Sequence, residues 1–376
     1  MSEHHQDATD HALSLCTYCP SLCRHACPVA RLRASDTVTP WGMMSLAHHV
    51  RHGIVDPSPD IYDTLSACVG CGSCTAVCLH EVDVAQALVE VKRTFAAAGH
   101  APDKSVFVHP AYAADHPFFE GLKARSRYEE RPTVSLVPSA KLIEGGGSLV
   151  HTLFDLCERL DVDALACGEL ARLDPGYDLW KAGHFAAFVE QARLFHAAAS
   201  GARDIVVMSP ETLYLLRDIY PRFGLSIGAE LSHVSEFLLP LLSGAFVSRQ
   251  PGRAVYFESC HLGRHLEKQD IPRQVVKRVL DGSLVELPKL SGTLGCCGGT
   301  GCGGEPTGRV GPALADEVLT ALADLGVTRL VTFSSECFVS LDGAQTRRTN
   351  AGLPTPVVEH ALTIVSAAVV RDGGAA

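Results

Sequence analysis

The sequence lacks a long apolar run and a surplus of basic residues, and these absences remove two classes of protein. No stretch of about eighteen uninterrupted apolar residues is present, so we expect no membrane-spanning helix. The closest candidate, residues 361–370, is too short to span a bilayer and predicts a terminal helix packed on the body of the protein. The formal net charge of -10 argues against a nucleic-acid partner, because phosphate binding requires a basic surface.

The N-terminus lacks the pattern of an export signal. Residues 1–15 are polar and rich in histidine, without the apolar segment of a secretory leader. Disulfides are therefore not expected, and the 15 cysteines are predicted to be reduced thiols of a cytoplasmic protein. Peripheral association with a membrane through a partner stays open. With 376 residues, 47 % of them hydrophobic and 20 % charged, the chain has the length and composition for two or three globular domains.

Eight of the cysteines lie in two runs near the N-terminus. The first run is Cys16, Cys19, Cys23 and Cys27, and the second is Cys68, Cys71, Cys74 and Cys78. This pattern is typical of a pair of [4Fe-4S] clusters, in which a fourth cysteine, often followed by proline, binds the other cluster. Pro28 follows Cys27. We therefore predict that one cluster is bound by Cys16, Cys19, Cys23 and Cys78, and the other by Cys68, Cys71, Cys74 and Cys27.

The two runs depart from the usual pattern in two places. Three residues separate Cys19 from Cys23 where two are usual, and Leu79 instead of proline follows Cys78. Both departures leave the number of ligands intact. Zinc is the weaker alternative, because a tetrahedral zinc site is satisfied by four ligands, usually in two separated C-x-x-C pairs.

The segment between and after the two runs predicts helices. Thr39 with Pro40 predicts a helix start and Gly53 its end, so a helix is expected over residues 40–52. Ser58 with Pro59 predicts a short helix before Cys68. The apolar stripe of the first helix is expected to cover the clusters: Met43, Met44, Leu46 and Val50. A further helix is expected over 84–95, and residues 98–115 are expected to form a linker.

From about residue 130, short β-like runs alternate with amphipathic helices, which predicts parallel α/β units. The strand-like runs are residues 133–137, 204–208, 254–258 and 329–333. Two landmarks also occur twice. Cys167-Gly168 matches Cys297-Gly298, and the segment from Ser209 to Thr212 matches the segment from Ser334 to Cys337. This repetition predicts an internal duplication. The expected fold is an α+β multidomain protein: an α-helical ferredoxin domain (1–97), a linker (98–130) and two cysteine-rich α/β repeats with parallel sheets (131–248 and 249–376).

The second repeat carries a further set of cysteines. Cys260 ends a predicted strand, Cys296 and Cys297 lie in a glycine-rich loop, and Cys337 follows another strand. Because the carboxyl ends of parallel strands meet at one edge of a sheet, these thiols are expected to converge. The first repeat is expected to hold no cluster: it has Ser139 or Ala140, the lone Cys167, and Thr212 at the matching positions.

These motifs carry a family resemblance. The N-terminal cysteine runs, followed by a duplicated domain with C…CCG…C spacing, resemble the cysteine-rich iron-sulfur proteins typified by heterodisulfide reductase subunits B and D, the iron-sulfur subunit of glycolate oxidase, and the corresponding subunit of anaerobic glycerol-3-phosphate dehydrogenase. The resemblance implies a third iron-sulfur cluster, cubane or noncubane, at Cys260, Cys296, Cys297 and Cys337. Some members end in C-x-x-C, where this chain has Ser334 and Cys337. Cys302 is a candidate for an extra ligand, and a thiol without a metal bond is its alternative role.

Three other features have structural interpretations. Cys157 is expected to be a small core residue of a helix. His261 is expected either to donate a hydrogen bond to a cluster sulfur or to begin a helix. The glycines of residues 298–304 do not form a phosphate-binding fingerprint and are better explained by close approach of backbone amides to cluster sulfurs.

No flavin or nicotinamide fingerprint is present, so electrons are expected to enter or leave through a partner. The resemblance implies that this partner is an FAD-containing flavoprotein. The expected function is that of an electron-transfer subunit of an oxidoreductase. The alternative is a catalytic subunit that reduces a disulfide or another small substrate at the C-terminal cluster. A redox sensor or scaffold is disfavoured, because three clusters in series form a path for electrons that a sensor does not need.

Overall fold

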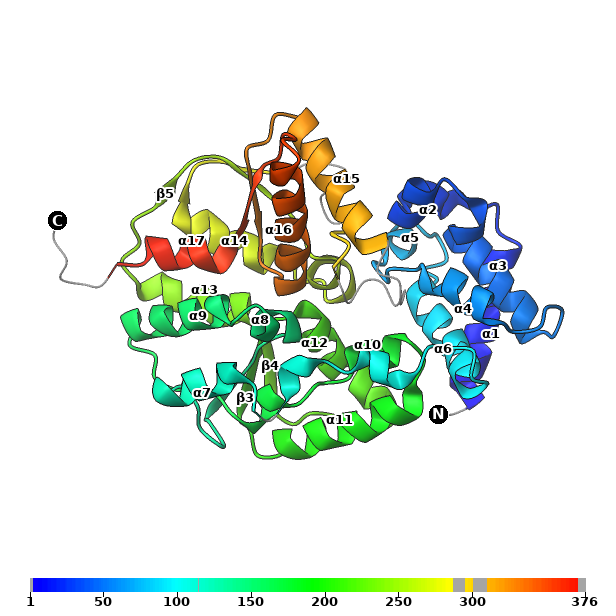
Figure 1. The fold of residues 1–376 in the computed structure, drawn as a ribbon, viewed down its shortest axis with the longest axis horizontal. Coiled ribbons are helices and arrows are strands. Elements are labelled where there is room, and N and C mark those ends of the chain that lie inside the picture. The colour runs from blue at the N-terminus through cyan, green and yellow to red at the C-terminus, as the bar shows by residue number, and fades with distance from the viewer. Residues whose placement is uncertain (1–2, 114, 287–294, 300–309, 371–376) are drawn as a thin grey trace.

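The computed structural model describes residues 3–113, 115–286, 295–299 and 310–370. A block of N-terminal helices lies beside a larger part that holds two parallel sheets with helices around them (Figure 1). The mixture of helices and parallel sheets that the sequence predicts is confirmed. The helix that begins at Ala361 is also found, and no helix within these ranges is long and apolar enough to cross a membrane.

The N-terminal block is helical and contains all eight cysteines of the two runs. Its helices are α1 (Glu3–Thr17), α2 (Pro28–Arg33), α3 (Pro40–Arg51), α4 (Pro59–Ser66), α5 (Ser73–Ala76) and α6 (Val84–Ala97), with the short turns η1 (Leu22–Ala26) and η2 (Asp36–Val38). The predicted start of α3 is confirmed, since the Thr39 hydroxyl accepts a hydrogen bond from the Gly42 amide at 2.9 Å. Met43 and Met44 are buried beside the cysteine-bearing segments, as the apolar stripe predicts.

The first sheet lies in the lower half of the larger part in Figure 1. Its strands run parallel in the order β2-β1-β3-β4: β1 (Val134–Val137), β2 (Leu165–Cys167), β3 (Asp204–Val207) and β4 (Glu230–His233). It is accompanied by η3 (Lys104–Phe107), η4 (Pro110–Tyr112), α7 (Pro117–Ala124), α8 (Ala140–Glu144), α9 (Ser148–Arg159), η5 (Glu169–Arg172), α10 (Tyr177–Lys181), α11 (Phe185–Ala199), α12 (Pro210–Tyr214), η6 (Leu215–Ile219), η7 (Tyr220–Phe223) and α13 (Val234–Gly244). Cys157 is fully buried in α9, as expected of a core residue.

The second sheet also runs parallel, in the order β10-β9-β6-β8. Its strands are β6 (Ala254–Tyr256), β8 (Leu284–Val285), β9 (Arg329–Thr332) and β10 (Val357–His360), and β5 (Gln250–Pro251) pairs with β7 (Leu280–Asp281). The helical elements are η8 (His261–His265), α14 (Asp270–Val279), α15 (Val310–Asp324), α16 (Ser335–Asn350) and α17 (Ala361–Ala368). Counted along the chain within each half, both sheets have the strand order 2-1-3-4. The duplication itself stays a prediction.

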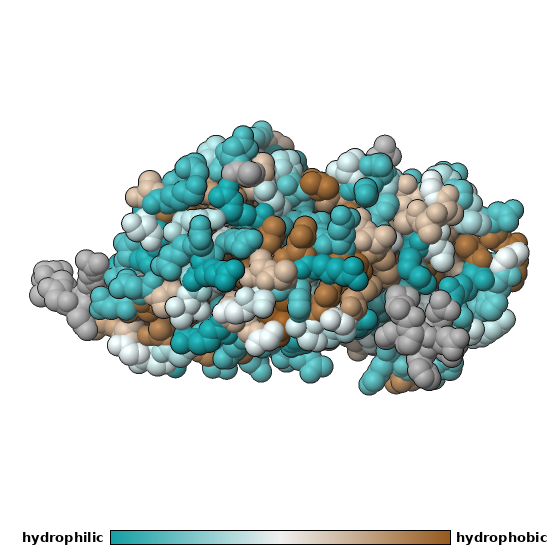
Figure 2. All heavy atoms as spheres, turned by 90° about the horizontal axis from the view of Figure 1, so that it is seen from below, coloured by the Kyte–Doolittle hydropathy of each residue, from teal (hydrophilic) through white to brown (hydrophobic). Residues whose placement is uncertain are grey.

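One apolar core joins the two halves. It contains Leu136 of the first sheet, Met208 directly after β3, Tyr256 and Val331 of the second sheet, and the buried sides of α9 and α17. Helices α9 and α13 lie next to α17 and α14 in the middle of the molecule (Figure 1). On the face that Figure 2 shows, hydrophilic residues predominate and apolar residues lie in small groups between them. The two halves are thus fixed to each other by a continuous buried interior.

Candidate iron-sulfur centres

The first thiol set consists of Cys16 in α1, Cys19 in the turn after it, Cys23 in η1, and Cys78 after α5. All four side chains are half-buried. Burial, together with smaller effects of the neighbouring thiols of Cys23, Cys78 and Cys19, raises the pKa of Cys16 to about 12. The structure therefore brings Cys78 of the second run to the first three cysteines of the first run, which is the predicted grouping. Their role as ligands stays a prediction.

The second thiol set consists of Cys27, Cys68, Cys71 and Cys74. Cys27 caps the N-terminus of α2, where its sulfur accepts a hydrogen bond from the Ala30 amide at 3.4 Å. Burial raises the pKa of Cys27 to about 12, with smaller contributions from the thiols of Cys71 and Cys68. The Cys74 thiol interacts with the other three and also with Cys23. The two thiol sets are therefore neighbours, and the cysteine before Pro28 lies with the second run.

The loop that carries the second set has an unusual backbone. Gly70 and Gly72 have positive φ angles of 69° and 68°, which favour glycine. The Gly70 amide donates to the Cys68 sulfur. Three consecutive carbonyls of this loop accept hydrogen bonds from side chains far along the chain: Val69 O from Lys181, Gly70 O from His265, and Cys71 O from Arg264. The loop is thus attached to both sheet-containing halves through its backbone.

The third thiol set lies at the carboxyl ends of β6 and β9. Cys260 precedes η8, and Cys337 lies in the first turn of α16, where its amide donates to Ser334 Oγ at 3.2 Å. The Cys337 thiol is hydrogen-bonded to Cys297 and interacts electrostatically with Cys260. Cys296 packs in one buried group with Cys260 and with Cys27 and Cys71 of the second set. All four thiols of the third set are therefore buried at the predicted edge of the sheet.

Glycines bring backbone amides close to these sulfurs, as the sequence predicts. The Gly298 amide donates to Cys296 Sγ at 3.4 Å, and the Gly299 amide donates to Cys297 Sγ at 3.3 Å. A Cβ atom at Gly298 would lie 1.9 Å from the Gly311 carbonyl oxygen. Only glycine therefore fits there. Cys302, Gly301, Gly303 and Gly304 lie outside the described residues.

His261 connects the third set to a pair of buried carboxyl groups. Its Nδ1 lies 3.5 Å from Cys260 Sγ and 3.2 Å from Glu211 Oε1, and its Nε2 lies 3.0 Å from the Tyr177 hydroxyl. Glu211 is hydrogen-bonded to Glu336, and burial raises the pKa of both carboxyl groups. Sequence reasoning missed this pair. The available signal was the glutamate at the same place in Ser-Pro-Glu-Thr (209–212) and Ser-Ser-Glu-Cys (334–337).

The corresponding edge of the first sheet has a different lining. Ser139 caps α8, and Thr212 donates its amide to Ser209 Oγ at 3.3 Å, as Cys337 does to Ser334 in the other half. Cys167 is fully buried in the core at the end of β2. A cavity of about 60 Å³ lies here, bordered by Ser139, Thr212 and both buried glutamates. Burial is the cause of the raised pKa of the Cys167 thiol, and no neighbouring thiol within the described residues contributes to that shift.

The charges around the second set fit an anionic group. Lys92 of α6 and Lys181 of α10 are 2 % and 4 % exposed, and both interact electrostatically with Cys68. Burial and the charge of Lys181 lower the pKa of Lys92 to about 7. Burying two cations side by side is unfavourable unless a negative charge compensates them. A [4Fe-4S] cluster with four thiolates carries net negative charge, so these residues suit such a group.

Among the described residues, no three His, Cys, Asp or Glu side chains converge on one point in the manner of ligands to a single metal ion. A [4Fe-4S] cluster instead separates its four thiolates around a larger body.

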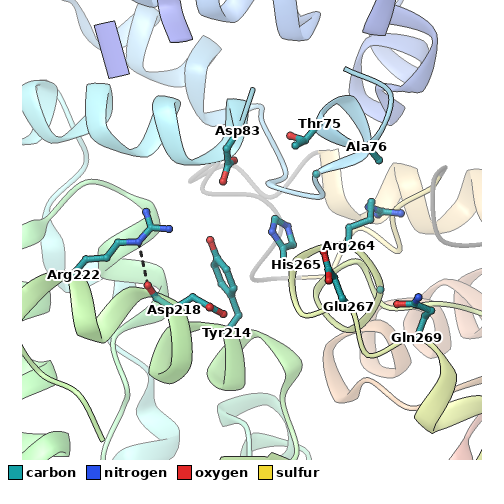
Figure 3. A pocket seen from close by; sticks show the side chains of 12 residues that line it. Thr75, Ala76, Asp83, Tyr214, Asp218, Arg222, Arg264, His265, Glu267 and Gln269 are labelled. Carbon is teal, nitrogen blue, oxygen red and sulfur yellow. Dashed lines mark hydrogen bonds between the residues drawn. The ribbon is translucent and has the colours of Figure 1, made fainter. Parts of the chain in front are cut away.

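A large cavity lies where the three parts meet. It has a volume of about 760 Å³, and Figure 3 shows side chains from the helical block, from α12 and from the segment after Cys260 around it. Tyr214 and His265 lie together on its wall, with ring centroids 5.0 Å apart. Gly72 of the second-set loop borders the same cavity. The cavity therefore reaches the backbone that holds the second set.

Comparison with known proteins identifies two domains. Residues 12–82 match the model of a 4Fe-4S dicluster domain, and residues 254–342 match that of a cysteine-rich domain of the CCG type. The chain thus contains both domains, and the predicted resemblance to cysteine-rich iron-sulfur proteins is confirmed.

Three relatives illustrate the similarity. A probable membrane-anchored ferredoxin of Chromohalobacter salexigens is 26 % identical over 64 % of this chain and 39 % of its own length. The probable iron-sulfur-binding oxidoreductase FadF of Bacillus subtilis is 32 % identical over 26 % of this chain and 14 % of its own length. One subunit of the dihydromethanophenazine:CoB–CoM heterodisulfide reductase of Methanosarcina mazei is 31 % identical over 22 % of this chain and 21 % of its own length. The chain therefore spans well under half of each of these proteins, and it is an iron-sulfur protein related to oxidoreductases.

Proposed function

We propose that the protein is an electron-transfer subunit of an oxidoreductase, with three iron-sulfur clusters held by the three thiol sets. The observation that supports this most strongly is the single buried group formed by Cys27 and Cys71 of the second set with Cys260 and Cys296 of the third. The first and second sets are also neighbours, through Cys23 and Cys74. The thiols thus form a continuous series from the helical block into the second sheet. When bound, the clusters supply one-electron transfer.

The proposed ligand sets are the predicted ones. Cys16, Cys19, Cys23 and Cys78 hold the first cluster, Cys68, Cys71, Cys74 and Cys27 the second, and Cys260, Cys296, Cys297 and Cys337 the third. The proposed domains are residues 1–97, 131–248 and 249–376, and residues 98–130 form the linker between the first and the second. The equal strand order of the two sheets supports an origin of the last two domains by duplication, with the thiols kept only in the second.

The proposed partner is an FAD-containing flavoprotein that docks at the first thiol set. Three large apolar side chains adjoin cysteines of this set and are strongly exposed: Tyr18, Leu22 and Leu79, at 81 %, 66 % and 91 %. Exposed aromatic and aliphatic side chains next to a redox centre suit a protein contact. Among the relatives, one is named an EtfAB:quinone oxidoreductase, from Syntrophomonas wolfei, at 33 % identity over 27 % of this chain and 14 % of its own length.

The test is anaerobic purification followed by iron and sulfide analysis and electron paramagnetic resonance (EPR) of the reduced protein. Two [4Fe-4S] clusters in the helical block correspond to about eight iron atoms per chain, with further iron from the third set. Cys71→Ser should remove one reduced-cluster signal and leave the others. Zinc, or about one metal ion per chain, would contradict the proposal.

A catalytic role is the second candidate, and one observation favours it. Reduction of a disulfide consumes two electrons and two protons and yields two thiols. The buried Glu211, Glu336 and His261 lie beside the third thiol set and are groups able to deliver protons. The two roles differ in one assay: isolated protein with an artificial electron donor turns over a disulfide only if it is catalytic. Cys302→Ser should then abolish that turnover. The missing cysteine at Ser334 favours electron transfer.

A further inference from the structure

Three cationic side chains surround the second thiol set. Lys92 comes from the helical block, Lys181 from α10 beside the first sheet, and Arg264 from η8 beside the second. Each acts electrostatically on a cysteine of the set: Lys92 and Lys181 on Cys68, and Arg264 on Cys71. The three parts of the molecule thus each contribute one cation to the same group of thiols.

The two lysines are held in place without exposure to water. Lys181 donates to the Val69 carbonyl at 3.2 Å, within the second-set loop. Lys92, Lys181 and Cys68 line one small cavity, in which the charge of Lys181 repels that of Lys92 and the Cys68 thiolate attracts it. Solvent screens such buried charges weakly, so their effect on a neighbouring redox group is large.

Arg264 lies between the second and third thiol sets. Its guanidinium donates to the Cys71 carbonyl and, at 3.0 Å, to the Gly295 carbonyl, which precedes Cys296 and Cys297. The thiols of Cys71, Cys260 and Cys296 all raise its pKa against the opposing effect of burial. A positive charge between two redox groups makes each of them easier to reduce, because an added electron is stabilised.

The first thiol set has different surroundings. Burial has the largest effect on the pKa of Cys16 and Cys23, and neighbouring thiols raise both values as well, whereas Lys181 and Lys92 are among the main influences on the pKa of Cys68. Its four cysteines are more open to solvent than Cys27 and Cys71. Exposure to water stabilises an added electron, so without the cations the first group would be the easier one to reduce.

We propose that Lys92, Lys181 and Arg264 reverse this order, making the cluster at the second thiol set easier to reduce than the cluster at the first. One electron then leaves the first cluster as one enters the second, with no bond or proton exchanged. The three positive charges thus favour electron transfer from the more exposed first set, through the second set, toward the third. The inference rests on the proposed ligand sets and adds the direction of flow and the residues that set it.

The test is an anaerobic redox titration of the full-length protein, with the reduced clusters followed by EPR. The variants are Lys92→Met and Arg264→Gln, and Cys19→Ser identifies the signal of the first cluster. Methionine fills the space of lysine and removes a buried charge, so Lys92→Met should fold. At the wild-type midpoint potential, each variant should lower the ratio of reduced to oxidised second cluster by about tenfold or more. The first cluster should not change.

Two controls separate charge from other effects. Arg264→Lys keeps the charge and should retain most of the wild-type ratio, and Lys123→Met removes an exposed lysine on α7 and should change nothing. An unchanged second cluster in Lys92→Met and Arg264→Gln, or equal shifts of both clusters, would overturn the inference and leave the proposed function standing. Wild-type protein without two cluster signals would instead refute the proposed function.

Discussion

At the residue scale, the two sheets differ in one side chain at the same hydrogen-bonded position. The amide of Thr212 donates to Ser209 Oγ, and the amide of Cys337 donates to Ser334 Oγ. The backbone at both helix starts is therefore built in the same way, and the side chain at this position is a hydroxyl in the first half and a thiol, the proposed ligand, in the second. Serine capping secures the helix in both halves and leaves the residue three positions later free to vary.

The lone thiol of the first half gives a direct test of this view. Cys167 is fully buried, and burial alone raises the pKa of its thiol. Cys167→Ala should leave the iron content and the EPR spectrum unchanged and should lower the free energy of unfolding by about 1 kcal/mol through the lost volume. Iron and sulfide analysis with thermal unfolding checks both. Loss of one cluster in this variant would show that the halves share a site.

At the element scale, the loop of residues 68–74 depends on glycines in the left-handed region. Gly72 has a φ of 68°, and an added Cβ would lie 3.3 Å from Cε1 of His265. Gly53, which ends the turn after α3, has a φ of 66°, and an added Cβ there would meet no atom within 4 Å. A side chain at either position would strain the backbone, but only a side chain at Gly72 would also press on a neighbouring residue, His265.

This contrast makes a matched pair of variants. Gly72→Ala and Gly53→Ala should each lower the free energy of unfolding by about 1 kcal/mol, because alanine is strained at positive φ. Gly72→Ala should in addition displace His265 and weaken retention of iron at the second thiol set. Thermal unfolding measures the shared cost, and iron release to a chelator measures the difference. Equal iron release from both variants would contradict this assignment of the loop.

Local signals allowed the prediction of several elements. Thr39 with Pro40, and Ser58 with Pro59, are helix starts that depend on neighbouring residues, and both were found. The grouping of Cys78 with the first run and Cys27 with the second followed from the proline after Cys27. The contacts of Arg264 with the Cys71 carbonyl could not be foreseen. The acceptor is a backbone atom, which any residue offers, and 193 positions separate the partners.

At the scale of the whole molecule, two buried histidines lie near the place where the halves meet, and their burial makes stability depend on pH. His233 and His360 cap α13 and α17, and the Phe333 ring lies against both. Burial lowers the pKa of each to about 3 from an ordinary value of 6.5. Between these values the unfolded chain binds the protons and the folded chain does not. The contribution of these histidines to the free energy of unfolding is therefore fully present above pH 6.5 and is lost as the pH falls from 6.5 toward 3.

This linkage predicts a specific rescue. Lowering the pH from 7 to 5 should reduce the free energy of unfolding by about 2 kcal/mol for each buried histidine. His360→Asn keeps an acceptor for the cap of α17 and removes one titrating group, so its melting temperature should fall less over this pH range than that of the wild type. His11→Asn, at an exposed position of α1, is the control and should behave as wild type. Equal acid sensitivity of all three proteins would argue against this role of His360.

The attachment of the second-set loop through three consecutive carbonyls also has a thermodynamic consequence. Lys181, His265 and Arg264 can reach Val69 O, Gly70 O and Cys71 O together only while the loop keeps one conformation. Metal loading and domain assembly then share a coupling free energy, which is reciprocal. A change that separates the helical block from the two sheets must therefore weaken iron binding at the second thiol set. The free energy lost is the same as that by which loss of iron weakens the attachment of the helical block to the sheets.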